Sequence, residues 1–176
     1  FAFEVAVILQ DGMRRMLTEQ EDGYYYITLV NENYTHPEMP EGAAEGIIRG
    51  MYLLRDAGKA KKNELRVQLM GSGTILREAI AAAELLERDF GVKSDIHSCP
   101  SYNELRRDGA DVERWNRLHP EAEPRKAWIT RQLEGRDGPA IAATDYVRQY
   151  ADQVRAYLPK GMAYTVLGTD GFGRSD

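Results

Sequence analysis

The chain has 176 residues, of which 43% are hydrophobic and 29% charged, and its formal net charge is −5. Such a composition is typical of a soluble globular protein with room for one α/β domain and a short extra segment. The negative charge argues against nucleic acid or an anionic membrane as the main partner, and no apolar run approaches the roughly 20 residues of a membrane-spanning helix. The single cysteine, Cys99, excludes an internal disulfide and favours a reducing, cytoplasmic location.

Residues 1–30 are expected to form a helix and then a strand. Apolar residues recur at helical spacing over 3–17, which predicts a helix that begins before the first residue. No basic region or cleavage site marks a signal peptide. The run 24–30 is rich in aromatic and β-branched residues and apolar on both faces, which predicts a strand in a covered sheet. Because the chain also stops just after a glycine-rich turn, at Asp176, we expect it to be a piece of a longer protein.

A polar connector and a second amphipathic segment follow. Pro37 and Pro40 interrupt residues 31–41 and predict a linker without regular hydrogen bonding. Apolar residues on one face predict a helix over 42–54. A short basic loop comes next, and we expect it to be a solvated turn; its cations are Lys59, Lys61 and Lys62.

The remainder alternates between strands and helices. Strands are predicted at 65–70, 95–99, 139–144 and 164–168. Helices are predicted at 74–90, from Ser101 with Glu104 as a capping box, at 111–118, and at 145–158 with Thr144 or Asp145 as its cap. Two prolines interrupt 119–124, and 128–133 is ambiguous. This alternation predicts an α/β fold with a mostly parallel sheet.

Two glycine-rich turns are candidate anion sites. Gly71-Ser72-Gly73 joins a strand to a helix, where backbone amides can hold a phosphate. Leu76 occupies the place of the third glycine of a dinucleotide motif, so a plain tight turn is favoured. The second turn spans 168–174. Arg174 could bind a carboxylate or phosphate there, but a structural loop anchored by Phe172 is the preferred interpretation.

The histidines and the cysteine suggest little chemistry. His36, His97 and His119 are far apart in sequence and form no metal-binding pair. His36, in the linker, is interpreted as a hydrogen-bonded interface residue rather than a general acid or base. Cys99 shares a strand face with His97, but a small buried residue is favoured over a nucleophile.

Residues 104–117 concentrate charge. Their arginines could dock an acidic partner surface, although intrahelical pairs with Glu104, Asp111 and Glu113 are favoured. These arginines are Arg106, Arg107, Arg114 and Arg117. Trp115 and Trp128 are predicted to be core or interface anchors. Within the sequence, no catalytic, cofactor-binding or metal-binding residue is predicted.

Three sequence runs carry a resemblance to a known family: YYYITLVNENY, ELRRDGADVERWNRLHP and VLGTDGFGRSD. Over nearly its full length the chain resembles the homodimeric type of pyruvate dehydrogenase E1 found in bacteria, a thiamine-diphosphate enzyme. The resemblance implies that 1–30 are the tail of a pyrimidine-binding (middle) domain and 31–45 an interdomain linker. It also implies that 46–176 form a three-layer α/β/α transketolase C-terminal-like domain, truncated at its end.

The resemblance also implies a reaction and partners. Enzymes of this family decarboxylate pyruvate on thiamine diphosphate and Mg²⁺ and reductively acetylate the lipoyl group of the E2 acetyltransferase. The family's GDG…N motif does not occur here, and its catalytic glutamate and histidines would lie upstream, so no catalytic residue can be assigned. We therefore expect a non-catalytic portion that binds no cofactor by itself and serves dimer packing with a second E1 subunit. The alternatives are a stand-alone interaction or regulatory α/β module, or the same region of a transketolase or another 2-oxo acid dehydrogenase.

Overall fold

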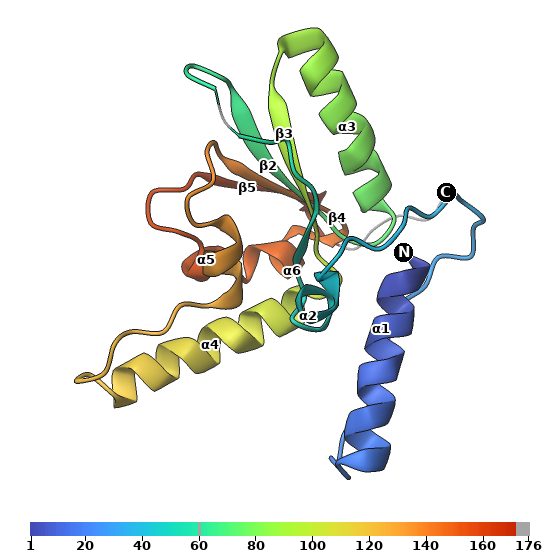
Figure 1. The fold of residues 1–176 in the computed structure, drawn as a ribbon, viewed down its shortest axis with the longest axis vertical. Helices are drawn as coiled ribbons and strands as arrows, with labels where there is room; N and C mark the ends of the chain where they lie inside the picture. Colours follow the sequence, from blue (N-terminus) through green and yellow to red (C-terminus); the bar gives the residue numbers. More distant parts are fainter. Residues whose placement is uncertain (60, 172–176) are drawn as a thin grey trace.

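The computed structural model describes residues 1–59 and 61–171, and within these ranges a five-stranded sheet forms the centre of the molecule (Figure 1). Its order is β1-β3-β2-β4-β5. The strands are β1 (Tyr52–Arg55), β2 (Arg66–Gly71), β3 (Lys93–Ser98), β4 (Ala140–Val147) and β5 (Tyr164–Thr169). β2 to β5 run parallel, and β1 pairs antiparallel with β3. The predicted α/β fold with a mostly parallel sheet is confirmed.

Helices cover both faces of the sheet. On one face, α3 (Ile75–Phe90) packs Leu76 and Ala83 against the strands β2 and β3. On the other face, α4 (Tyr102–Leu118) and α5 (Trp128–Leu133) form a larger core with β2 and β4. Five of six positions are buried in β2 and in β3, as expected for strands covered on both sides. The three-layer α/β/α arrangement is therefore present.

Helix α4 is capped at its start by Ser101 and allows close packing at Gly109. The Ser101 hydroxyl accepts a hydrogen bond from the Glu104 backbone N–H at 3.2 Å, which satisfies one of the free donors of the first turn. The helix then runs unbroken to Leu118, so the two predicted helical pieces are one element. Gly109 allows the Tyr157 ring to pack closely, because a Cβ atom at 109 would lie 2.4 Å from that ring.

The N-terminal helix is confirmed, but the strand after it is not. α1 (Ala2–Met13) continues as a short π-helix, η1 (Arg14–Thr18), close to the predicted 3–17. Residues 24–30 form no strand; Tyr24 and Tyr26 are 90% and 87% exposed. A strand needs a neighbour for its backbone hydrogen bonds, and none is available to this run in the described part of the chain. Among the same residues, no helix combines the length and the apolarity needed to cross a membrane.

The predicted helix over 42–54 is wrong beyond Ile48. α2 (Ala43–Ile48) is short, and the chain then turns at Gly50 and enters β1. Gly50 has a φ of 92°, which favours glycine, and it lies against the backbone of Ser101. The apolar residues that suggested one helical face therefore divide between α2 and β1.

The predicted helix over 145–158 is confirmed only in part. β4 extends to Val147, which pairs with Thr169 of β5. Only α6 (Arg148–Asp152) and a 3₁₀ turn, η2 (Arg155–Tyr157), follow. Val147 occupies the cap position, so neither Thr144 nor Asp145 caps the helix. Sheet pairing with β5 outweighs the helical pattern here, because the pattern contains no information about the neighbouring strand.

Candidate functional site

A buried carboxylate joins the N-terminal helix to the sheet. Glu4 of α1 is 8% exposed, and its Oε1 accepts hydrogen bonds from the Tyr52 hydroxyl at 2.8 Å and the Ser98 hydroxyl at 2.5 Å. Tyr52 begins β1 and Ser98 ends β3, and the two are partners in the sheet register. The Phe1 amino group also contacts Glu4. We call Glu4, Tyr52 and Ser98 the α1 junction.

Apolar side chains surround the α1 junction. Ala43, Ile47 and Tyr52 form a buried cluster, against which apolar residues of α1 pack; these are Phe3, Val7 and Ile8. Burial, and then the charge of Glu4, raise the pKa of Tyr52 well above its usual value. Tyr52 is therefore a neutral donor at physiological pH, and the junction is a positioning contact rather than a proton-transfer pair.

Glu4 was not singled out from the sequence, although a signal exists. It lies three and four residues before Val7 and Ile8, on the face of α1 that packs inward. A carboxylate on an apolar helix face needs buried donors, because an unpaired buried charge is very costly. The donors come from residues more than forty positions away, which no local pattern identifies.

The linker is fixed between two helices. His36 Nδ1 accepts a hydrogen bond from the Ala2 backbone N–H at 3.1 Å, and its ring stacks on Tyr34 at 4.5 Å. The guanidinium of Arg77, from α3, lies 4.7 Å from the Tyr34 ring and 3.7 Å from the Glu32 carboxylate. The predicted hydrogen-bonded role of His36 is confirmed.

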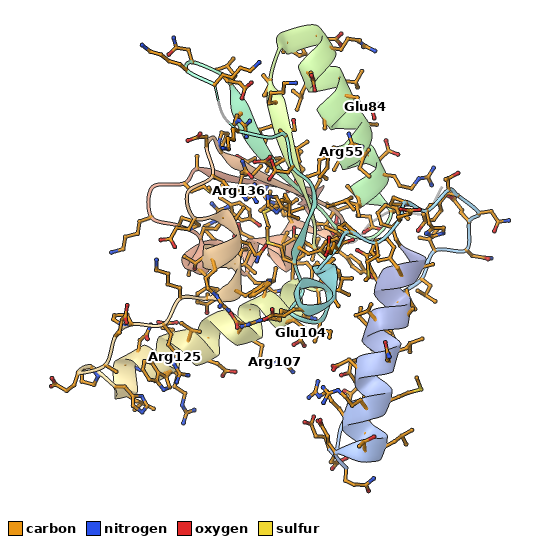
Figure 2. The ribbon with its side chains drawn as sticks, in the orientation of Figure 1. Arg55, Glu84, Glu104, Arg107, Arg125 and Arg136 are labelled. Carbon is orange, nitrogen blue, oxygen red and sulfur yellow. The ribbon has the colours of Figure 1, made fainter. Side chains whose placement is uncertain are left out.

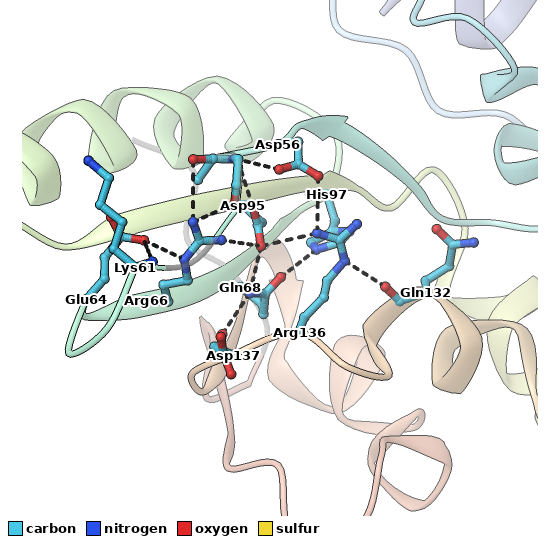
Figure 3. A network of polar contacts seen from close by, with 12 residues as sticks. Asp56, Lys61, Glu64, Arg66, Gln68, Asp95, His97, Gln132, Arg136 and Asp137 are labelled. Carbon is cyan, nitrogen blue, oxygen red and sulfur yellow. Dashed lines mark hydrogen bonds and ion pairs between the residues drawn. The ribbon is translucent and has the colours of Figure 1, made fainter.

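A second polar cluster lies around Asp95, toward the beginnings of the parallel strands (Figure 3). Asp95 is 2% exposed. It accepts hydrogen bonds from the Ala57 N–H at 2.8 Å, from Gln68 Nε2 at 2.9 Å and from Arg136 at 3.2 Å. Burial alone would raise the pKa of Asp95, but these donors and the positive charge of Arg136 hold it below its usual value. The Asp95 carboxylate therefore stays ionised. Its hydrogen bonds connect β3 with Gln68 of β2 and with the loops that contain Ala57 and Arg136.

His97 belongs to the same cluster and is fully buried. Its Nε2 lies 3.0 Å from Gln68 Oε1. Gln68 already donates from its amide nitrogen to Asp95 and to the Asp137 carbonyl, so its oxygen accepts and His97 Nε2 carries the proton. Burial, and then the charge of Arg136, lower the pKa of His97 to about 3. The imidazole is neutral, and its low pKa makes it too weak a base to take the proton of the Cys99 thiol.

Cys99 is also inert. It is 1% exposed, and burial raises the pKa of its thiol to about 12. A nucleophilic cysteine needs a thiolate at working pH, which this environment disfavours. The predicted small buried residue is confirmed, and the sequence spacing of His97 and Cys99 does not produce a catalytic pair.

The carboxyl ends of the strands are where ligands bind in open α/β sheets. Here the Ser72 and Thr144 hydroxyls lie 3.5 Å apart, and Thr74 donates to Asp145 at 3.5 Å. The Asp145 carboxylate thus already supplies negative charge beside the start of α3, which disfavours a phosphate. Gly71 is needed for packing, since a Cβ there would lie 2.6 Å from Leu76 Cα. The arrangement is that of a tight turn.

The second glycine-rich turn is described only as far as Gly171. Gly168 lies close to the backbone of Tyr146, and a Cβ at 168 would be 2.9 Å from that carbonyl oxygen. Asp170 forms an ion pair with Arg148 at 2.9 Å. The predicted anchor Phe172 and the candidate anion-binding Arg174 lie outside the described residues.

The arginines of α4 differ from the prediction. Arg107 pairs with Glu104, but within the described ranges Arg106, Arg114 and Arg117 form no ion pair, so the expected pairs with Asp111 and Glu113 are absent. These side chains are exposed, where a single ion pair gains little against side-chain entropy. The cations of the basic loop at Lys59, Lys61 and Lys62 are likewise exposed.

The two tryptophans have different environments. Trp128 is a core anchor: its Nε1 donates to the Met51 carbonyl at 2.8 Å, and the guanidinium groups of Arg49 and Arg131 lie 4.4 and 4.9 Å from its ring. Trp115 is half-buried near the end of α4. It stacks on the His119 ring at 4.4 Å and beneath the Arg125 guanidinium at 3.7 Å. The prediction of a core anchor is therefore confirmed for Trp128.

Comparison with known proteins identifies the class. The family model of the transketolase-like TK C-terminal domain matches residues 50–176, and the chain belongs to this family. A second model, the pyruvate dehydrogenase E1 component middle domain, matches residues 1–37. The α1 junction therefore connects the two matched segments.

The chain is also similar to individual curated proteins. The chain is 57% identical over 176 residues to the pyruvate dehydrogenase E1 component of Cupriavidus necator, and 54% identical over 177 residues to that of Escherichia coli K12. Both alignments cover 100% of this chain and 19% of the relative, so the chain spans about a fifth of their length. The resemblance to the pyruvate dehydrogenase E1 family is confirmed. A solved transketolase from Campylobacter jejuni is 20% identical with a TM-score of 0.41, over 72% of this chain and 15% of that chain.

Proposed function

We propose that the chain is the C-terminal portion of a cytoplasmic pyruvate dehydrogenase E1 component. The whole enzyme would decarboxylate pyruvate with thiamine diphosphate and Mg²⁺ and acetylate the lipoyl group of an E2 acetyltransferase. The observation that carries this proposal is the 57% identity along the full chain. Residues 1–30 would be the tail of the middle domain, 31–45 the linker and 46–176 the C-terminal domain.

This portion would itself perform no chemistry. Its cysteine is protonated and buried, its buried histidine is neutral, and no group of three His, Cys, Asp or Glu side chains suited to a metal ion occurs in the ranges the structure describes. The residues present do not fit thiamine diphosphate with Mg²⁺, because Asp145 stands beside the helix start where a diphosphate would need donors alone. The cofactor site would belong to the rest of the enzyme.

The role left for this portion is to hold domains and subunits in place. The α1 junction ties the segment that matches the middle domain to the sheet of the C-terminal domain. The linker is held by α1 on one side and α3 on the other. A second E1 subunit and the E2 acetyltransferase are the expected partners, whereas nucleic acid and membrane are not. Precise domain positions matter in such enzymes, because misplacing a cofactor or substrate by about 1 Å can cost a hundredfold in rate.

A chimera tests this proposal. The matching stretch of the Cupriavidus necator E1 is replaced by this chain, and the matched control carries the Escherichia coli stretch, which is 54% identical to this chain. We expect both chimeras to turn over pyruvate within about tenfold of the parent, a difference of roughly 1.4 kcal/mol in transition-state stabilisation. A chimera with this chain that folds but stays inactive, beside an active control, would refute the proposal.

Calorimetric titration of the 176-residue chain with thiamine diphosphate and Mg²⁺ complements the chimera. We expect no saturable heat, because the described residues offer no suitable site. Saturable binding would mean that the glycine-rich turns hold a ligand, and the non-catalytic assignment would then be wrong.

A further inference from the structure

A small cavity lies between the second half of α3 and the edge of the sheet. Its volume is about 240 Å³, and it is lined by the end of β1, the beginning of β3 and three residues of α3, namely Ala83, Glu84 and Glu87. Figure 2 shows two of the lining residues, Arg55 and Glu84, near each other at this place. Pockets for drug-sized ligands measure roughly 300–1,000 Å³, so this cavity suits a smaller metabolite.

The wall of the cavity contains a buried hydroxyl without a partner. Ser94 lines the cavity and is 7% exposed, and among residues 1–59 and 61–171 its Oγ forms no hydrogen bond. Ser94 lies two positions before Ile96 on β3, so both side chains project from the face of the sheet that α3 covers. A buried hydroxyl left unpaired is costly, and it therefore calls for a polar atom in the adjacent space.

An irregularity in β1 directs Arg55 to the same face of the sheet. Leu53 of β1 lies opposite His97 of β3. Arg55 then lies opposite Ile96, the neighbour of His97, so β1 contains one extra residue. Residues directly opposite each other project from the same face, and Ile96 packs toward α3. An unbroken register would instead place Arg55 opposite Asp95, on the other face. Bulges of this kind re-aim side chains and are over-represented beside active sites.

The charged groups around the cavity divide into occupied and free ones. Lys93 pairs with Glu87, and Asp56 accepts a hydrogen bond from a neighbouring backbone N–H at 2.6 Å. Arg55 and Glu84 lie 3.8 Å apart, which is too far for a hydrogen bond, and within the described ranges neither side chain forms a hydrogen bond elsewhere. The free groups are therefore a guanidinium, a carboxylate and the Ser94 hydroxyl.

We propose that this cavity binds a small α-amino acid in its zwitterionic form. The carboxylate of the ligand accepts hydrogen bonds from the Arg55 guanidinium and the Ser94 hydroxyl, and its ammonium group donates to Glu84. Guanidinium groups bind carboxylates with paired N–H donors, and both ends of the ligand are charged at neutral pH. The methyl group of Ala83 borders the cavity and leaves apolar surface for a side chain as small as that of alanine. The site goes beyond the reaction proposed for the whole enzyme.

Titration of the isotope-labelled 176-residue chain with L-alanine, followed by NMR, tests the site. We expect saturable shifts of the backbone amide signals around the cavity. The Kd should be on the order of 1 mM, because the side chains of Arg55 and Glu84 are 49% and 70% exposed and water screens their charges. Propionate lacks the ammonium group and ethylamine lacks the carboxylate, and each should bind at least about tenfold more weakly than L-alanine.

Two variants and a control assign the binding to these side chains. Ser94→Ala should raise the Kd for L-alanine about tenfold without lowering the free energy of unfolding, because it removes a hydroxyl that has no partner in the described chain. Arg55→Gln should raise the Kd at least as much. The control Arg88→Gln removes a cation of α3 that pairs with the adjacent Asp89, outside the cavity, and should leave the Kd unchanged.

Three results would each overturn the proposal. The first is the absence of saturation at concentrations up to about fiftyfold above the expected Kd. The second is equal binding of propionate and L-alanine, which would indicate a simple anion site. The third is a Kd that responds to neither Ser94→Ala nor Arg55→Gln. None of these results depends on pyruvate turnover, so the site can fail while the chimera remains active, and the reverse.

Discussion

His97 shows how one buried side chain couples stability to pH. Its pKa is lowered by burial to about 3, whereas an unfolded histidine titrates near 6.5. Between these values the unfolded chain binds a proton that the folded chain does not. The free energy of unfolding therefore falls as the pH drops below about 6.5, by about 1.4 kcal/mol per pH unit from this group.

The change His97→Gln removes that dependence and keeps a donor for Gln68 Oε1. We expect the slope of unfolding free energy against pH, measured by urea denaturation from pH 4.5 to 6, to decrease by about 1.4 kcal/mol per pH unit. Asp95 contributes at lower pH, because its pKa is depressed and its stabilisation is lost only as the pH falls below the carboxyl range. The exposed His119→Gln is the control. An unchanged slope in His97→Gln would contradict the neutral, buried imidazole.

Glu4 accepts both hydrogen bonds of the α1 junction, so its removal leaves two buried donors unsatisfied. We expect Glu4→Leu to lower the free energy of unfolding by about 1–3 kcal/mol for each donor that stays unpaired, Tyr52 and Ser98. Adding Tyr52→Phe removes one of those donors, and the double variant should be more stable than Glu4→Leu alone. Strictly additive losses in this double-mutant cycle would show that the hydrogen bond contributes nothing.

At the scale of elements, Gly50 separates α2 from β1. Gly50→Ala meets two penalties: a positive φ of 92°, and a Cβ placed 2.3 Å from the Ser101 carbonyl oxygen. Gly58 also has a positive φ, 80°, but nothing lies within 4 Å of its Cβ position. Thermal unfolding should show Gly50→Ala to be less stable than Gly58→Ala by at least about 1 kcal/mol, the cost of overpacking. Equal losses would mean that backbone strain alone acts at both sites.

The elements that could be predicted are those whose signals are local. β2, α3 and β3 were predicted correctly because a buried strand, an amphipathic helix and its glycine stop follow one another in sequence. The end of β4 and the whole of β1 were missed, since pairing with β5 or β3 decides them. The α1 junction and the Asp95 cluster were missed for the same reason: their partners come from distant parts of the chain.

At the scale of the whole molecule, residues 24–30 are strongly apolar yet exposed, with Leu29 at 68%. A run of this composition fits a covered sheet. Under the proposed function, the rest of the middle domain would cover it in the complete enzyme. Exposed backbone without hydrogen-bonded neighbours is also the preferred substrate of proteases.

Limited proteolysis can therefore compare how accessible this region is in the isolated chain and in the chimeric enzyme. A glutamate-specific protease should cut the 176-residue chain first within residues 19–41, because this stretch contains no helix or strand and several glutamates. Trypsin should leave the same stretch intact, since no lysine or arginine lies between Arg15 and Arg49. In the chimeric E1 we expect the part assigned to the middle domain, up to residue 30, to be protected from the glutamate-specific enzyme as well. Cleavage after Glu19 or Glu21 that is equally fast in the chimera would mean that this part stays exposed, and would remove the reason to place it in a middle domain.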